Sequence, residues 1–185
     1  EQERKPIVVC DADIVRIYKY QSFGKIFKRI MECSSLMRKK GLINSEIIGI
    51  YSPVCTAART SFVLNMAKIL AQKYKVLYIN LEEFSGLGEL LPGGSNGDLS
   101  DALYYYRQGG EQTAAKISEI VQSIAGIDYI PAAKCAEDIA DIESEELIQF
   151  VEAIGRFSLY EIIILDISAA IKQSWKLIEF CDCIY

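Results

Sequence analysis

Short, continuously apolar runs alternate along the chain with segments whose apolar residues recur at helical spacing. Three of these runs are strong strand signals, at Glu46–Tyr51 (EIIGIY), 75–80 (KVLYIN) and 161–166 (EIIILD). Strands that are apolar on both faces are typical of a parallel sheet that helices cover on both sides. The pattern therefore predicts an α/β fold with an open, mostly parallel sheet and helices on both faces, in which these three strands are neighbours in the core.

Helical periodicity fills most of the intervals between the strands. It is clear after the first strand, where Val63, Met66, Ala67, Leu70 and Tyr74 fall on one face. Helices are predicted over 60–73, near 100–106, and over 112–124, 144–157 and 170–180, with short strands at 128–131 and 181–185. The cluster PGGSNG at 92–97 predicts a loop.

Residues 1–41 carry a separate pattern. A short buried strand is predicted at 5–10 and a helix at 22–40, which Gly41 would end. These elements indicate an N-terminal extension or the end of an earlier unit, placed before a main domain over 46–185. Because the chain stops within a predicted strand, we expect the main domain to be incomplete at its C-terminal end.

Composition excludes several classes of function. The net charge of −5 provides no broad basic field, so nucleic acid is not an expected partner. Histidine is absent, which removes imidazole bases, Ser-His-Asp triads and most zinc sites. The six cysteines form no CxxC pair and are expected to be buried thiols. No apolar run approaches the roughly 18 residues that span a bilayer.

The stretch GIYSPVCTAARTSF at 49–62 joins a strand to a helix through a short loop. Backbone N–H groups at such a helix start are a common anion-binding site. Polar residues also follow the next strands, with Glu82 and Glu83 after one and Asp166 at the end of another. Because ligands of doubly wound sheets bind beyond the carboxyl ends of the strands, these three places form one candidate site.

Simpler interpretations of the same residues stay open. Arg59 and Thr60 open a helix, which Thr60 or Thr56 would cap. Asp166 at a strand end is suited to cap the helix that follows it. A pair of adjacent glutamates such as Glu82 and Glu83 lies more often in a solvated turn than in a metal site.

From Ile47 to Tyr185 the chain resembles the MinD/ParA group of P-loop ATPases, which carry a deviant Walker A motif. The similarity rests on YSPVCTAARTSFVLNMAKILAQKYKVLYINLEEFSGL and LYEIIILDISAAI, in that order and spacing. The Ser-Pro entry and the LEEFSGL continuation resemble the CpaE/TadZ-type proteins of tight-adherence pilus systems. Those proteins place a receiver-like domain before the ATPase domain, and IYKYQSFGKIFKRI is similar to the end of a receiver.

The resemblance places the family pattern Lys-Gly-Gly-x-Gly-Lys-Thr-Thr on residues 54–61. Val54 then stands where the signature lysine would be, and Arg59 where the P-loop lysine would be. The resemblance implies nucleotide contacts from Cys55, Thr56, Ala57, Ala58, Arg59, Thr60 and Ser61, Mg²⁺ ligands in Thr60 and Asp166 if nucleotide binds, and Glu82 as the candidate catalytic carboxylate.

The lost glycines and the lost lysine weaken this site. Each non-glycine residue that is forced into a left-handed conformation costs about 1–2 kcal/mol. Val54 also removes positive charge from the place where phosphoryl transfer develops negative charge. ATP with Mg²⁺ is therefore the expected cofactor if any is bound at all, with binding weakened and hydrolysis lost.

The function that the resemblance implies is a cytoplasmic positioning or scaffold protein of a pilus system, at the inner face of the membrane or a cell pole. Its expected partners are a second copy of the chain and pilus or secretion assembly proteins. The alternative is a functional ATP-dependent dimerisation switch of the MinD/ParA type. A kinase-like relative would need an intact P-loop and a tyrosine-rich tail, which this sequence lacks.

Overall fold

A computed structural model describes residues 45–53, 57–83, 85, 87, 96–110, 112–124 and 126–185, without the side chains of 57, 58 and 157. The chain divides into two compact units, Glu1–Lys39 and Lys40–Tyr185, and all described residues belong to the second. The strand predicted at 5–10, the helix predicted at 22–40 and most of the loop predicted at 92–97 lie outside the described residues. The receiver-like interpretation of residues 1–41 stays a prediction.

Six strands form one sheet in the order β3-β4-β2-β5-β1-β6. All neighbours are parallel except β3 and β4, which are antiparallel at one edge. The bounds are β1 Glu46–Tyr51, β2 Val76–Leu81, β3 Gln122–Ile124, β4 Ile127–Ile130, β5 Ile162–Ile167 and β6 Cys183–Ile184. The three strands predicted from apolar runs are β1, β2 and β5, and they are neighbours, as predicted. Strand β5 lies between β2 and β1.

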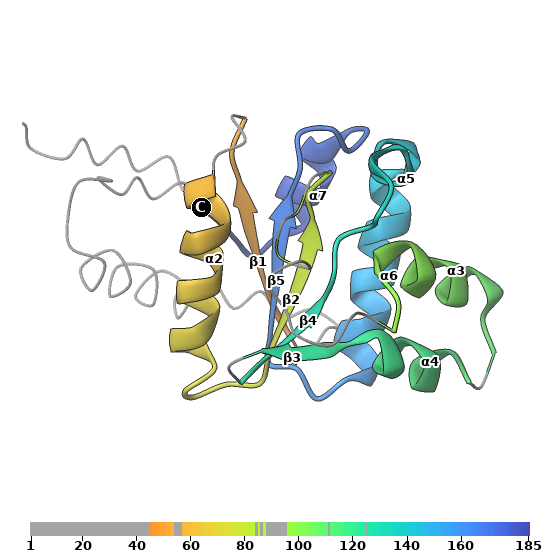
Figure 1. Ribbon diagram of the computed structural model, residues 1–185, viewed down its shortest axis with the longest axis horizontal. Helices are drawn as coiled ribbons and strands as arrows, with labels where there is room; N and C mark the ends of the chain where they lie inside the picture. The colour runs from red at the N-terminus through yellow and green to blue at the C-terminus, as the bar shows by residue number, and fades with distance from the viewer. Residues whose placement is uncertain are drawn as a thin grey trace, which may run out of the picture. The chain divides into compact units, whose positions relative to one another are not determined.

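Helices cover both faces of the sheet, which confirms the predicted fold class. Figure 1 shows α2 on one side of the strands and α3, α4 and α6 on the other. The bounds are α2 Ala57–Leu70, α3 Leu99–Gln108, α4 Thr113–Ile120, α5 Ala136–Asp141, α6 Ser144–Phe157 and α7 Ser174–Phe180. Because both faces are covered, every residue of β2 and β5 is buried.

The start and end of α2 differ from the prediction. The helix begins at Ala57 and ends at Leu70, whereas residues 60–73 were expected. Thr60 therefore lies inside the first turn and does not cap the helix. The predicted apolar face is confirmed for Val63, Met66 and Leu70, which are fully or almost fully buried against the sheet.

The predicted helix over 112–124 is wrong beyond Ile120. Val121 takes an extended conformation with φ −60° and ψ 126°, which ends α4. Residues Gln122–Ile124 then pair with β4 across a turn that contains Gly126 at φ 84°. The Tyr129 hydroxyl donates a hydrogen bond of 2.6 Å to Gln122 Oε1, so a side-chain contact supports this edge pairing.

Two further elements differ from the predictions. Helix α5 was not predicted, because its six residues are too few to show a helical period. The last helix begins at Ser174 rather than at 170, because Gln173 has a left-handed backbone with φ 55° that a continuous helix excludes.

The C-terminal residues of the chain, which include β6, are hydrogen-bonded to β1. The Asp182 carboxylate accepts a hydrogen bond of 2.8 Å from the Ile47 amide, and Tyr51 N–H donates to the Tyr185 carbonyl at 2.9 Å. A Cβ built on Gly49 would lie 2.3 Å from Ile184 Cδ1, which is closer than non-bonded carbon atoms approach. A side chain at position 49 would therefore force Ile184 and Cys181 to shift.

Candidate functional site

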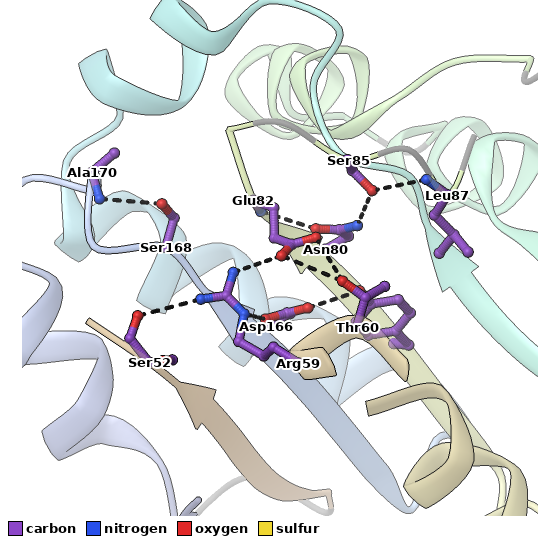
Figure 2. Close-up of polar contacts among 11 residues, drawn as sticks. Ser52, Arg59, Thr60, Asn80, Glu82, Ser85, Leu87, Asp166, Ser168 and Ala170 are labelled. Carbon is purple, nitrogen blue, oxygen red and sulfur yellow. Dashed lines mark hydrogen bonds and ion pairs between the residues drawn. The ribbon is translucent and has the colours of Figure 1, made fainter. Parts of the chain in front are cut away.

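The first turn of α2 meets the carboxyl ends of β2 and β5. These two strands are adjacent and parallel, with Asn80 opposite Asp166 in the register, so both end at the same edge of the sheet. The segment that leaves β1 at the same edge leads to α2. Figure 2 shows the Glu82 and Asp166 carboxylates and the Ser52 backbone carbonyl converging on the Arg59 guanidinium.

Arg59 makes close contacts with two carboxylates. Its Nη2 lies 2.7 Å from Glu82 Oε1 and its Nε lies 2.8 Å from Asp166 Oδ1. The third nitrogen, Nη1, is 3.5 Å from the Ser52 carbonyl oxygen. One guanidinium therefore connects α2 to the ends of β1, β2 and β5.

The cluster of Arg59, Glu82 and Asp166 is withdrawn from water. The three residues are 5%, 9% and 0% exposed. Two carboxylates against one guanidinium leave the ionised cluster with a formal charge of −1. Burial of charges of this kind is costly unless each is paired and hydrogen-bonded. Arg59 donates a hydrogen bond to Glu82, whereas its contact with Asp166 Oδ1 is an ion pair without hydrogen-bond geometry.

Two hydroxyl groups also donate hydrogen bonds to the carboxylates. The Tyr78 hydroxyl donates to Asp166 Oδ2 at 3.1 Å, and the Thr60 hydroxyl donates to Glu82 Oε2 at 3.3 Å. Burial and the neighbouring Glu82 charge raise the pKa of Asp166 from 3.8 to about 6, although Arg59 and Tyr78 oppose the rise. Burial, followed by the charges of Asp166 and Glu82, raises the pKa of Tyr78 well above its usual value.

A second set of hydrogen bonds orients the segment after β2. The Asn80 side chain accepts a hydrogen bond of 2.9 Å from the Glu82 amide and donates one of 2.7 Å to the Ser85 hydroxyl. Ser85 in turn accepts one of 3.3 Å from the Leu87 amide (Figure 2). Asn80 thus fixes the backbone that presents Glu82 to Arg59.

The predicted nucleotide-binding residues are only partly described. Cys55 and Thr56 lie outside the described residues, and Ala57 and Ala58 form the backbone of the first turn of α2. Ser61 is exposed and its carbonyl accepts a hydrogen bond from the Asn65 side chain. Whether these residues contact a nucleotide stays a prediction.

The structure does place four of the predicted site residues together, namely Arg59, Thr60, Glu82 and Asp166. Glu82 is buried in an ion pair, so the interpretation of a solvated turn is wrong for it. Asp166 does not cap the following helix, because α7 begins only at Ser174, and the Ser168 hydroxyl accepts the Ala170 amide at 3.2 Å in the turn between them.

Tyr78 and the connecting role of Asn80 were missed by the sequence analysis. Tyr78 lies within an apolar run, and a tyrosine in such a run is normally interpreted as a core residue. Side chains alternate across a strand, so Tyr78 and Asn80 lie on one face of the sheet, and their register partners Ile164 and Asp166 lie on the same face. That alternation is the signal that would have placed Tyr78 beside Asp166.

A bound Mg²⁺ does not fit this arrangement of side chains. The oxygen donors of Thr60, Glu82 and Asp166 are of the type that Mg²⁺ prefers. Both carboxylates, however, already hold the Arg59 guanidinium at contact distance. Within the described ranges, no group of three or more acidic residues or cysteines gathers in a way that suits a metal ion. A divalent cation at Glu82 and Asp166 would have to displace Arg59.

Solved structures that are similar to this chain include a ParA family ATPase, a kinase domain and a MinD protein. A ParA family ATPase from Chlorobium tepidum TLS aligns with a TM-score of 0.60 at 23% identity. The alignment covers 76% of this chain and 59% of the ATPase chain. The VpsO kinase domain gives 0.56 at 16% identity, with 88% and 82% covered. The septum site-determining protein MinD from Pyrococcus horikoshii OT3, complexed with Mg-ADP, gives 0.52 at 18% identity, with 70% and 51% covered.

These similarities establish the fold alone. The described part of the chain has the α/β fold of ParA/MinD-like P-loop ATPases, and the chain spans 59% and 51% of the ParA and MinD structures. No protein-family model matches the sequence, and no curated protein matches it either. In the described ranges, no helix has both the length and the apolar character needed to cross a bilayer.

Proposed function

We propose that this chain is a positioning or scaffold module with the fold of a ParA/MinD-like ATPase, in which nucleotide binding is weakened and ATP hydrolysis is lost. The observation that carries the proposal is the pairing of Arg59 with Glu82 and Asp166. Arg59 is the residue that the resemblance puts in place of the phosphate-binding lysine. A guanidinium that is held by two buried carboxylates does not reach a phosphate at the start of α2 without first breaking both ion pairs.

The same contacts weigh against hydrolysis. Phosphoryl transfer is catalysed mainly by positive charge and Mg²⁺ placed around the transferred group. Here Val54 stands in place of the signature lysine, and both the expected metal ligand Asp166 and the candidate catalytic carboxylate Glu82 are paired with Arg59. Negligible ATPase activity follows from this loss of available cations.

A scaffold of this kind acts through contacts with other proteins. The CpaE/TadZ-like sequence features support a place among pilus or secretion assembly proteins, and the ParA/MinD-like fold supports pairing with a second copy. That pairing would use the face that carries the α2 start. We expect it to be weak without nucleotide, because Val54 cannot reach across to a partner's phosphate.

The test is a calorimetric titration of the chain with Mg-ATP and, for comparison, with ADP, together with a phosphate-release assay. The expected result is weak or no binding and turnover no higher than a blank without protein. The matched variant replaces Cys55, Thr56 and Ala58 by Gly and Arg59 by Lys, and it should bind Mg-ATP at least tenfold more tightly than the native chain.

The alternative, an ATP-dependent dimerisation switch, makes opposite predictions. It requires micromolar Mg-ATP binding by the native chain, turnover that Asp166→Ala abolishes, and a dimer in light scattering that forms only with ATP. Any one of these results would replace the scaffold proposal.

A further inference from the structure

Arg59 occupies the centre of a set of oxygen atoms that come from separate elements. Glu82 Oε1, Asp166 Oδ1 and the Ser52 carbonyl oxygen face its three nitrogens at 2.7, 2.8 and 3.5 Å. Figure 2 shows these oxygens on different sides of the guanidinium, with the Thr60 hydroxyl on the far side of Glu82. A cation surrounded by oxygen donors is the arrangement of a metal site, with a guanidinium in the place of the ion.

The basic residues of the other described ion pairs bind different partners. Arg107, Lys134, Arg156, Lys172 and Lys176 pair with acidic residues elsewhere in the described part of the chain. Removal of the Arg59 charge would therefore leave Glu82 and Asp166 as two buried carboxylates without the guanidinium that pairs with both.

We propose that the Arg59 guanidinium is the built-in cation of this site: it holds Glu82 and Asp166 together without a metal ion, and a divalent cation binds Thr60, Glu82 and Asp166 only when Arg59 is removed. The inference rests on the proposed function, because a chain that works without hydrolysis needs no exchangeable metal. It goes further in assigning the cation role to one side chain and in predicting a latent metal site.

The chemistry of the donors specifies the ion. One hydroxyl and two carboxylates are hard oxygen ligands that suit Mg²⁺ and its paramagnetic substitute Mn²⁺. A chain without Arg59 has two buried negative charges there, and a divalent cation neutralises both. The guanidinium neutralises only one of them.

The test is a Mn²⁺ titration of the full chain followed by electron paramagnetic resonance, in which bound Mn²⁺ is lost from the free-ion signal. Five proteins are compared: the native chain, Asp166→Asn, Arg59→Gln, Arg59→Gln with Asp166→Asn, and Arg156→Gln. Arg156 is a matched control because it pairs with Glu152 on the exposed face of α6. We expect Arg59→Gln to bind about one Mn²⁺ per chain at least tenfold more tightly than the native chain, the double variant to lose this gain, and Arg156→Gln to behave as the native chain does.

Two results would overturn the inference. One is tight Mn²⁺ binding by the native chain that Asp166→Asn abolishes, because Arg59 would then not exclude the metal. The other is a folded Arg59→Gln chain without any gain. If near-ultraviolet circular dichroism shows that Arg59→Gln does not fold, Arg59→Lys replaces it. The single ammonium of lysine cannot make the same two-sided contact, so a gain in Mn²⁺ affinity is expected there too, and its absence overturns the inference.

Failure here and failure of the proposed function give different results. ATP turnover by the native chain overturns the scaffold proposal whatever the Mn²⁺ data show. A native chain that neither binds nor hydrolyses ATP, combined with an Arg59→Gln chain that binds no Mn²⁺, overturns only the assignment of Arg59 as the built-in cation.

Discussion

Removal of the Arg59 charge should destabilise the chain far more than removal of an exposed arginine charge. In Arg59→Met the apolar stem is retained while the ion pairs with Glu82 and Asp166 are lost. Breaking a buried ion pair from one side costs about 3–5 kcal/mol, because the remaining charge is left buried without a partner. The matched change Arg156→Met removes an exposed pair with Glu152 and should cost at most about 1 kcal/mol.

The measurement is urea unfolding without divalent cations, with the free energy of unfolding extrapolated to water for both variants. A triple variant, Arg59→Met with Glu82→Gln and Asp166→Asn, separates charge from packing. Neutral groups of similar volume can replace a buried ionic cluster at little cost, so the triple variant should regain at least half of the stability that the single variant loses.

Either of two outcomes would refute the prediction that the Arg59 charge stabilises the fold. A loss of less than about 1 kcal/mol in Arg59→Met would mean that water reaches the carboxylates and that the cluster is not a buried network. A triple variant that is less stable than the single variant would mean that the guanidinium acts through packing of its stem and not through its charge.

Three further predictions concern neighbouring contacts. Tyr78→Phe removes a donor to a buried carboxylate and should lower the free energy of unfolding by about 1.5–3 kcal/mol in urea. Gly49→Ala places a Cβ 2.3 Å from Ile184 Cδ1 and should cost about 1–3 kcal/mol in the same assay, with part of the loss recovered by Ile184→Ala. The pKa of Asp166 is about 6 when folded against 3.8 ordinarily, so between these values the folded chain holds a proton that the unfolded chain has released. The contribution of Asp166 to stability should therefore increase as the pH falls from about 6 to about 4, and Asp166→Asn should remove this slope from a series of thermal midpoints.

The central strands were predictable because their apolar runs have few alternative structures. Glu46–Tyr51 matches β1 without a shift, and β2 and β5 lie one residue beyond the expected bounds. The edge of the sheet was not predictable in the same way. In Gln122–Ile124 three residues are too few for a strand period, and the pairing that makes them a strand comes from β4.

The members of the site were predictable, but the contacts among them were not. Parallel strands place their carboxyl ends at one edge, which brought Arg59, Glu82 and Asp166 to the same place from the sequence pattern alone. The direction of the Arg59 side chain depends on the register that sets Asn80 opposite Asp166 and on the turn that Asn80 holds for Glu82. Sequence reasoning took Arg59 as a residue that meets an anion at the helix start, whereas the structure turns it toward the strands.

The ion pairs of Arg59 with Glu82 and Asp166, which define the closed form of the site, limit how tightly this chain can bind a nucleotide. A ligand shifts a conformational equilibrium only through its different affinity for the two states. If Arg59 must leave Glu82 and Asp166 before phosphate and Mg²⁺ can bind, the open form lies about 3–5 kcal/mol above the closed one. Its population is then roughly one part in 150 to one part in several thousand, and the apparent affinity falls by the same factor.

That factor separates the consequences of the two proposed functions. An open site of micromolar intrinsic affinity would show an apparent dissociation constant from about 0.1 mM to several mM, since each 1.4 kcal/mol is a factor of ten. A switch built on such a site would respond only at high nucleotide concentration, because much of the binding free energy would be used to separate Arg59 from Glu82 and Asp166. A scaffold loses nothing by the same closure, because the ion pairs keep α2 attached to β2 and β5 when no ligand is present. The closed cluster therefore favours a chain whose loop-bearing face is fixed in one conformation over a chain that alternates between two.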